Sequence, residues 1–169
     1  MEQPGRLRRT LRNLFSTRND MERAFPPAAL RTITEAITAG ERTHRGEVRL
    51  IVEKGLPPAQ AWAGVTTRQR AVALFADYGI WDTEENCGVL IYVNLAERKV
   101  DIVADRGIDR RIAPGVWQGV CDTMTRGFAR GEFEAGALAA VERVNGLLRE
   151  HFPADGARPN ELPDEPLML

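Results

Sequence analysis

Two apolar runs, residues 88–93 and 99–105, are separated by a polar break of only five residues, 94–98. A break of this length suits a hairpin between antiparallel strands and is too short for the crossover that joins parallel neighbours. The first run is apolar almost throughout, which is typical of a central strand covered on both faces. The second run is more polar and is expected to be its neighbour in the sheet.

The register of this hairpin follows from the position of its turn. With the turn centred near Ala96, we expect Val93 to lie opposite Lys99, and Cys87 to lie opposite Asp105. The acidic flanks of the two strands then converge at one edge of the sheet.

Upstream, residues 46–53 alternate apolar and charged side chains, which predicts a strand. A helix over 67–78 follows, and a strand, helix, strand order is expected to form a right-handed parallel crossover. Apolar residues at helical spacing predict one helix that starts at Pro26-Pro27 and two more after residue 110. The predicted fold class is α/β, a three-layer α/β/α sandwich. Its central mixed sheet is a parallel βαβ crossover followed by an antiparallel hairpin, and two C-terminal helices complete it.

The chain divides into three parts. Residues 1–22 form a basic amphipathic segment, 23–152 the α/β domain, and 153–169 an acidic, proline-rich tail. The first segment either packs on the domain or acts as an arm that binds a membrane surface or a partner. Likewise, the apolar ending 167–169 is either a docking peptide or folds back onto the core.

Composition excludes several classes of protein. A net charge of -1 argues against a nucleic-acid binder, because such proteins carry a strong basic excess. The chain has no run of about 20 apolar residues, so we expect no transmembrane segment. No secretory signal is apparent, and we expect a cytoplasmic protein that can lie peripherally on a membrane. Cys87 and Cys121 have no metal-ligand spacing, and we interpret both as small buried apolar residues.

Charged residues flank the outer ends of the hairpin. They precede the first apolar run or follow the second: Asp82, Glu84, Glu85, Asp105, Arg106 and Asp109. Glu47, at the start of the upstream strand, falls on the same edge. Converging carboxylates repel one another, and an Arg or a hard divalent cation relieves that cost. The edge is also the carboxyl end of the last strand, and Gly107 allows the backbone to turn beside it. The alternative is that these acidic side chains are simply solvated.

At these residues the chain resembles the TPM domain family. The likeness rests on five segments: THRGEVRL at 43–50, DTEENCGVLIYV at 82–93, RKVDIVADRGI at 98–108, FARGEFEAG at 128–136 and NELPDEP at 160–166. The resemblance implies an α/β/α fold and a site at positions Asp82, Asp105 and Arg106, with Glu47 a weaker candidate. Plant members are described as acid phosphatases, and some relatives as binding calcium or magnesium. The expected metal ligands are then these: Asp82, Glu85, Asp105, Asp109 and Glu47.

Two functions remain open. One is an accessory or assembly module of a membrane-associated complex, with a calcium or magnesium site at the rim. Its partner would be a LemA-like protein or another TPM protein, as the family resemblance suggests. The other is a cation-assisted phosphomonoester hydrolase, in which Asp82 or Asp105 acts as nucleophile or base and Arg106 stabilises the phosphate. No Asp-x-Asp pair, Cys-x5-Arg loop or P-loop supports it, and His44 and His151 are expected at the surface.

Overall fold

The computed structural model describes residues 3–169. Its strands form one four-stranded sheet in the order β3-β2-β1-β4. The strands are β1 (Glu47–Glu53), β2 (Gly88–Asn94), β3 (Lys99–Ala104) and β4 (Leu167–Met168). Both β2 and β4 run parallel to β1, whereas β3 is antiparallel to β2. The predicted mixed sheet, with a parallel crossover and an antiparallel hairpin, is confirmed.

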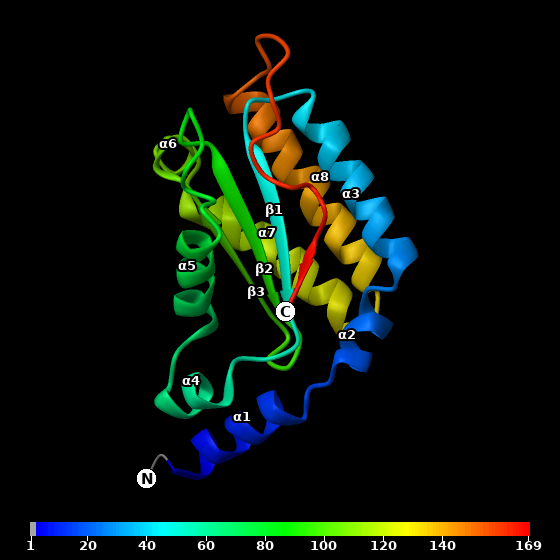
Figure 1. Cartoon of the computed structure of the whole chain (residues 1–169), viewed down its shortest axis with the longest axis vertical. Coiled ribbons are helices and arrows are strands. Elements are labelled where there is room, and N and C mark those ends of the chain that lie inside the picture. The colour runs from blue at the N-terminus through cyan, green and yellow to red at the C-terminus, as the bar shows by residue number, and fades with distance from the viewer. Residues whose placement is uncertain (1–2) are drawn as a thin grey trace.

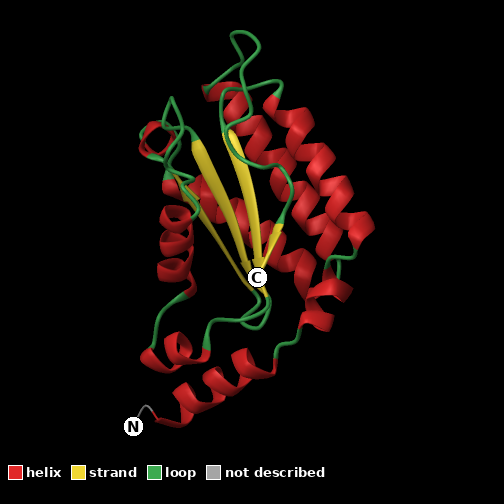
Figure 2. Cartoon of the chain, viewed as in Figure 1, coloured by secondary structure: helices red, strands yellow, loops and turns green. Residues whose placement is uncertain are grey.

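Helices cover both faces of this sheet (Figure 1, Figure 2). They are α1 (Gln3–Phe15), α2 (Arg18–Ala24), α3 (Pro27–Glu41), α4 (Pro58–Ala63), α5 (Thr67–Asp77), α6 (Arg106–Asp109), α7 (Pro114–Ala129) and α8 (Phe133–His151). On one face lie α3, α7 and α8, and on the other lie α5 and the C-terminal tail. This is the expected three-layer sandwich. No helix within residues 3–169 is both long and apolar enough to cross a membrane.

Local sequence explains where the helices begin. Pro27, Pro58 and Pro114 occupy the first turns of α3, α4 and α7, where a missing backbone N–H costs no hydrogen bond. Thr17 and Thr66 cap α2 and α5, each within a reciprocal capping box. These boxes satisfy backbone N–H groups at the starts of the two helices.

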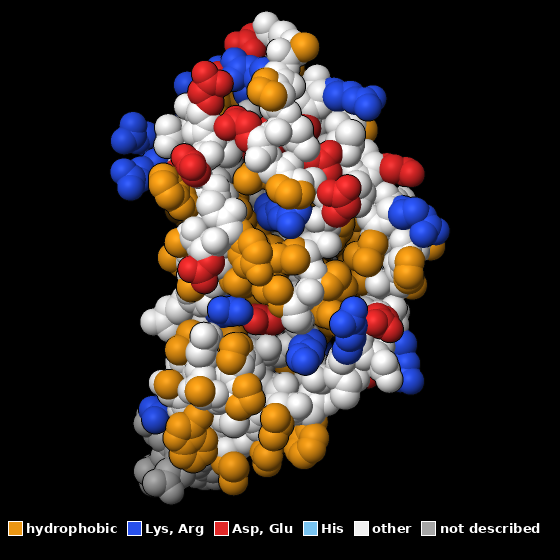
Figure 3. Space-filling view, viewed as in Figure 1, with side chains coloured by type: hydrophobic (Ala, Val, Ile, Leu, Met, Phe, Trp, Pro, Cys, Tyr) orange, Lys and Arg blue, Asp and Glu red, His pale blue; other side chains and the backbone are white. Residues whose placement is uncertain are grey.

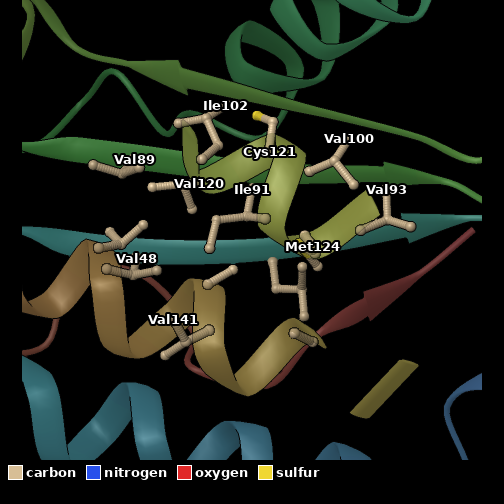
Figure 4. Close-up of a cluster of buried hydrophobic side chains, with 14 of the residues drawn as sticks. Val48, Val89, Ile91, Val93, Val100, Ile102, Val120, Cys121, Met124 and Val141 are labelled. Atoms are coloured by element: carbon tan, nitrogen blue, oxygen red, sulfur yellow. The ribbon is translucent and has the colours of Figure 1, made fainter. Parts of the chain in front are cut away.

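The larger core lies between the sheet and the α3, α7 and α8 layer. Figure 4 shows side chains from three strands meeting α7 and α8 there: Val48, Val89, Ile91, Val93, Val100, Ile102, Val120, Cys121, Met124 and Val141. Cys87 and Cys121 are buried and unbridged, as predicted. Burial raises the pKa of both thiols to about 11, so neither is a thiolate near neutral pH.

The predicted hairpin register is wrong by one residue. Val93 lies opposite Val100, not Lys99, and Asp105 donates its backbone N–H to Gly88 O at 2.9 Å instead of facing Cys87. The turn is centred one half-residue later than assumed, with Arg98 in the left-handed region at φ 52°. A slip of one residue reverses every side chain on a strand, and only the observed register pairs apolar with apolar residues across the core face.

The C-terminal tail folds back onto the sheet. β4 adds to the free edge of β1, and Leu169 continues the pairing through hydrogen bonds with Val52 and Lys54. Leu162 is buried, and Leu167 and Leu169 pack against the smaller core beneath α5. The tail is therefore a structural element of the sandwich.

A buried polar network joins the carboxyl ends of β1 and β2. The Glu53 carboxylate, 4% exposed, accepts hydrogen bonds from Arg70 Nη2 at 2.7 Å and from the Tyr92 hydroxyl at 2.6 Å. Asn94 Nδ2 donates to the same hydroxyl at 3.1 Å. Burial is the main reason that the pKa of Tyr92 is raised, so the phenol remains a donor. Each polar atom named here has a partner, which a buried charge requires.

We expect Tyr92→Phe to destabilise the protein by about 2 kcal/mol, because it removes a donor to a buried charge and an acceptor for Asn94. Urea unfolding followed by circular dichroism measures this loss. Tyr78→Phe is the matched control, since Tyr78 is 43% exposed and should change stability by less than about 0.5 kcal/mol. Equal effects of the two substitutions would contradict the role given to the network.

Candidate functional site

The segments that flank the hairpin do converge at one rim of the sheet. Glu47 N donates to Cys87 O at 3.0 Å, which joins the start of β1 to the loop before β2. The loop also meets α6: a Cβ on Gly107 would lie 2.6 Å from Asn86 O and 3.1 Å from Glu85 O. Glycine is required at position 107 for this close approach of two backbones, not for a turn.

Asp105 is the most buried acid of the rim, with only 6% of its surface exposed. Its side chain caps α6, and Oδ1 accepts the Arg106 N–H at 2.6 Å. Oδ2 is buried and has no hydrogen-bond partner among the described residues. A carboxylate oxygen without a partner at this depth is costly.

Glu85 is held by two arginines instead of being available as a ligand. Arg45 Nη1 donates to Oε2 at 2.6 Å, and Arg158 from the tail pairs with Oε1. The Arg45 guanidinium also lies 6.0 Å from the centre of the Phe152 ring. Arginine does offset acidic charge at the rim, as the sequence suggested. The arginines that do so are Arg45 and Arg158, which were not among the predicted site residues.

Glu47 lies at the predicted edge, but its side chain serves the tail. Its Oε2 accepts the Leu162 N–H at 3.1 Å, and burial raises the pKa of the carboxyl. In contrast, Asp82, Asp109 and Arg106 are exposed, and no hydrogen bond or ion pair of their side chains occurs within the described chain.

The predicted ligands do not assemble into one donor set. Within residues 3–169, no group of three or more His, Cys, Asp or Glu side chains is arranged to hold a metal ion. The rim also lies at the amino ends of the parallel strands β1 and β2. The antiparallel strand β3 has its carboxyl end there. The usual ligand position in open α/β sheets is the opposite edge, at the carboxyl ends of the parallel strands.

Beside the rim, a cavity of about 610 Å³ opens between α3 and the tail. Its acidic residues are Glu41, Glu47 and Asp164. Burial, together with the nearby Glu47 and Asp164 carboxylates, raises the pKa of Glu41 to about 9, although Val48 N donates to Oε1 at 2.8 Å. Glu41 is thus protonated at neutral pH and shares a hydrogen bond with Asp164, which also accepts from the Thr38 hydroxyl.

His44, expected at the surface, is buried with only 3% of its area exposed. Its Nδ1 accepts the Gly46 N–H at 3.2 Å, so Nε2 carries the proton and donates to Asn145 Oδ1 at 3.0 Å. Burial lowers the pKa of the imidazole and keeps it neutral. The residue is a structural link between the end of α3 and α8, a role that a lone His in a sequence does not reveal.

Comparison with known proteins decides the family. The family model described as the TPM domain matches residues 18–147. The chain belongs to the TPM domain family. Among solved structures, it is similar to the BA42 protein from the psychrophilic bacterium Bizionia argentinensis, with a TM-score of 0.74 and 25% sequence identity over 83% of this chain and 92% of that chain. No curated protein matches the chain.

A second similar structure is the N-terminal domain of a protein from P. gingivalis, with a TM-score of 0.59 and 19% identity. It covers 77% of this chain and 82% of that domain, and it supports the fold alone. The TPM fold and family expected from the sequence are therefore confirmed.

The sequence did not reveal that α1 of this TPM protein packs by its polar side. Arg9 donates to Glu97 Oε1 at 2.7 Å and to Val65 O at 2.6 Å, which ties α1 to the hairpin turn and to the segment that follows α4. Asn13 accepts the Leu56 N–H at 2.7 Å. The apolar side faces outward instead: Leu7, Leu11, Leu14 and Phe15 are between 39% and 71% exposed.

The contribution of Glu41 to the stability of the TPM protein should fall as the pH rises from about 5 to 9. Over this range the folded state keeps a proton on Glu41, whereas the unfolded chain, with a pKa near 4.5, has released it. Stability falls with pH wherever the native state binds more protons. Thermal melting at several pH values measures the slope. Glu41→Gln should flatten it, and Glu35→Gln, an exposed site on the same helix, should not; an unchanged slope in Glu41→Gln would refute the assignment.

Proposed function

We propose that this TPM-domain protein is an accessory module that docks on an anionic membrane surface beside a membrane-associated complex. The observation that supports this function is the outward apolar face of α1. Figure 3 shows apolar side chains gathered over the end of the molecule where α1 and α4 lie. We call this surface the apolar patch, and define it by Leu7, Leu11, Leu14 and Phe15 of α1 and Trp62 of α4.

The composition of the patch suits a lipid interface. Helices that lie in the interface plane carry Leu, Phe and Trp on the buried side and Arg or Lys on the flanks. Arg8 and Arg12 flank the leucines and are exposed, and no acidic residue occurs between Gln3 and Phe15. Trp62, 52% exposed, adds the aromatic side chain that favours the headgroup level.

The same charge pattern disfavours a second copy of the chain as the occupant. A twofold contact places the same patch on both subunits, so that the α1 arginines of one protomer would face those of the other. With no acidic residue on α1, this contact is repulsive. An anionic membrane offers an apolar interior to the leucines of the patch and negative headgroups to the α1 arginines.

We expect the protein to sediment with vesicles rich in phosphatidylglycerol and not with phosphatidylcholine vesicles. Leu14→Asp with Phe15→Asp should reduce binding more than tenfold, because each buried apolar side chain contributes about 1.5–3 kcal/mol. Val72→Asp is the matched control, since Val72 is an exposed apolar residue on α5. Patch-dependent recovery of a membrane protein without vesicle binding would instead indicate a protein partner and overturn lipid docking.

The alternative function is a cation-assisted phosphomonoester hydrolase centred on Asp105. It is favoured by the buried Oδ2, which lacks a partner among the described residues. It is opposed by the absence of three converging donors within the same residues. Calcium or magnesium would be held by Asp105, with Asp82 and Asp109 as the further ligands expected from the sequence, and would supply charge stabilisation at phosphate.

An assay of p-nitrophenyl phosphate with calcium, magnesium or chelator separates these functions. An accessory module shows no turnover above the no-protein rate and no cation-dependent rise in melting temperature. A hydrolase shows turnover that Asp105→Asn abolishes. Asparagine retains the helix cap, so this variant removes the charge without removing the start of α6.

A further inference from the structure

A second cavity, of about 700 Å³, lies at the opposite edge of the sheet from the rim. Its walls come from α1 and α2, from the turn that follows β2, and from the corner between α7 and α8. Leu95 and Ala96 of the turn line it directly after the last residue of β2. The cavity thus occupies the carboxyl edge of the parallel strands, where open α/β sheets bind ligands.

Three arginines line this cavity: Arg12, Arg23 and Arg98. Two carboxylates are also present, but both are engaged within the protein. Glu97 accepts hydrogen bonds from Arg9 and Asn13, at 2.7 and 3.1 Å. Asp20 is occupied by the capping box of α2, which lowers the pKa of its carboxyl. The three arginines outnumber the two carboxylates, so the lining carries a net positive charge.

Two of the arginine side chains have no polar partner in the described part of the chain. The Arg98 backbone N–H donates to Leu95 O, but its guanidinium makes no hydrogen bond or ion pair there, and the Arg23 side chain only lowers the pKa of Asp20 through its charge. A neighbouring hollow contributes more positive charge through Arg8, Arg9 and Lys99. Unpaired guanidinium groups around a concave surface are suited to a phosphate group, which accepts two parallel hydrogen bonds from one arginine.

The floor of the cavity is apolar. It includes Leu95, Phe128 and Phe133, and the centres of the two phenyl rings are 5.0 Å apart. Phe128 is only 4% exposed, so the partly buried Leu95 and Phe133 supply most of the accessible apolar surface. A ligand with an apolar or aromatic portion can pack on this floor while its anionic end faces the arginines.

We propose that this cavity binds a phosphate group attached to an apolar or aromatic portion. This site goes beyond membrane docking through the apolar patch and lies at the other edge of the sheet from Asp105. Two sources share the chemistry: a phospholipid headgroup and a soluble phosphate monoester. Arg12 lines the cavity and belongs to α1, the helix that carries the apolar patch, which favours a lipid source.

The test uses phenyl phosphate as the probe and amide NMR spectra of the full chain as the readout. Phenyl phosphate should shift the amides of Leu95, Ala96, Arg98 and Gly131, and inorganic phosphate should shift the same amides more weakly. Phenol alone should not bind. Shifts confined to other parts of the molecule, or equal binding of phenol and phenyl phosphate, would overturn the proposal.

Substitution of the unpaired arginines provides the matched comparison. Arg23→Gln with Arg98→Gln should weaken phenyl phosphate binding at least tenfold, while Arg31→Gln, an exposed arginine on α3, should leave it unchanged. The amide spectra show directly whether each variant is folded. Equal affinity of the double variant and the parent protein for phenyl phosphate would refute the proposed site.

Vesicles distinguish the two sources and separate this site from the docking function. If phosphatidic acid vesicles displace phenyl phosphate, the ligand is a lipid headgroup; if they do not, a soluble ester is supported. The Leu14→Asp, Phe15→Asp variant should still bind phenyl phosphate after losing vesicle binding. A protein that binds phenyl phosphate but not vesicles would contradict the docking function alone. A protein that binds vesicles but not phenyl phosphate would contradict the phosphate site alone.

Discussion

Three charged side chains are buried on the central strand β1, and the rest of the structure supplies their partners. Glu47 accepts a backbone N–H of the tail, Arg49 donates to two tail carbonyl groups at 2.5 Å, and Glu53 binds Arg70 of α5 and the Tyr92 hydroxyl. A buried charge without such partners would cost several kcal/mol. The tail and α5 must therefore both be packed on β1 before Glu47, Arg49 and Glu53 can be buried. This requirement explains why the short β4 is fixed although only two of its residues pair with β1.

Much of this fold could be predicted because its strongest signals are local. The continuous apolar run of β2, the helix start at Pro27 and the short break between β2 and β3 each specify one element. The tail strand could not be predicted, because two paired residues have no period, and Glu47, Arg49 and Glu53 look like the solvent face of a half-exposed strand. The one-residue error in register has a similar cause: the turn geometry depends on a left-handed Arg98, and Arg carries no signal for that conformation.

For the candidate site, too, the backbone arrangement could be predicted and the side-chain contacts could not. Sequence spacing correctly brings the loop before β2 and the segment after β3 to one rim, since backbone pairing determines where strands end. It does not determine side-chain partners. Glu85 is taken by Arg45 and by Arg158, and the latter is more than 70 residues away in sequence and belongs to the tail. The amphipathic pattern of α1 likewise predicts a helix with an apolar face but not the direction of that face.

That direction follows from a continuous series of hydrogen bonds that begins in the sheet. Glu53 binds the Tyr92 hydroxyl, Tyr92 binds Asn94, and Asn94 Oδ1 accepts the Glu97 N–H at 2.9 Å. Glu97, with its side chain only 3% exposed, then binds Arg9 and Asn13 of α1. Rotating α1 to bury its leucines would leave the Glu97 carboxylate and the Leu56 N–H without the partners that Arg9 and Asn13 provide, and unsatisfied buried polar groups are costly. A helix held by its polar side leaves the leucines to be covered from outside the chain, and a lipid surface would cover them without breaking these bonds.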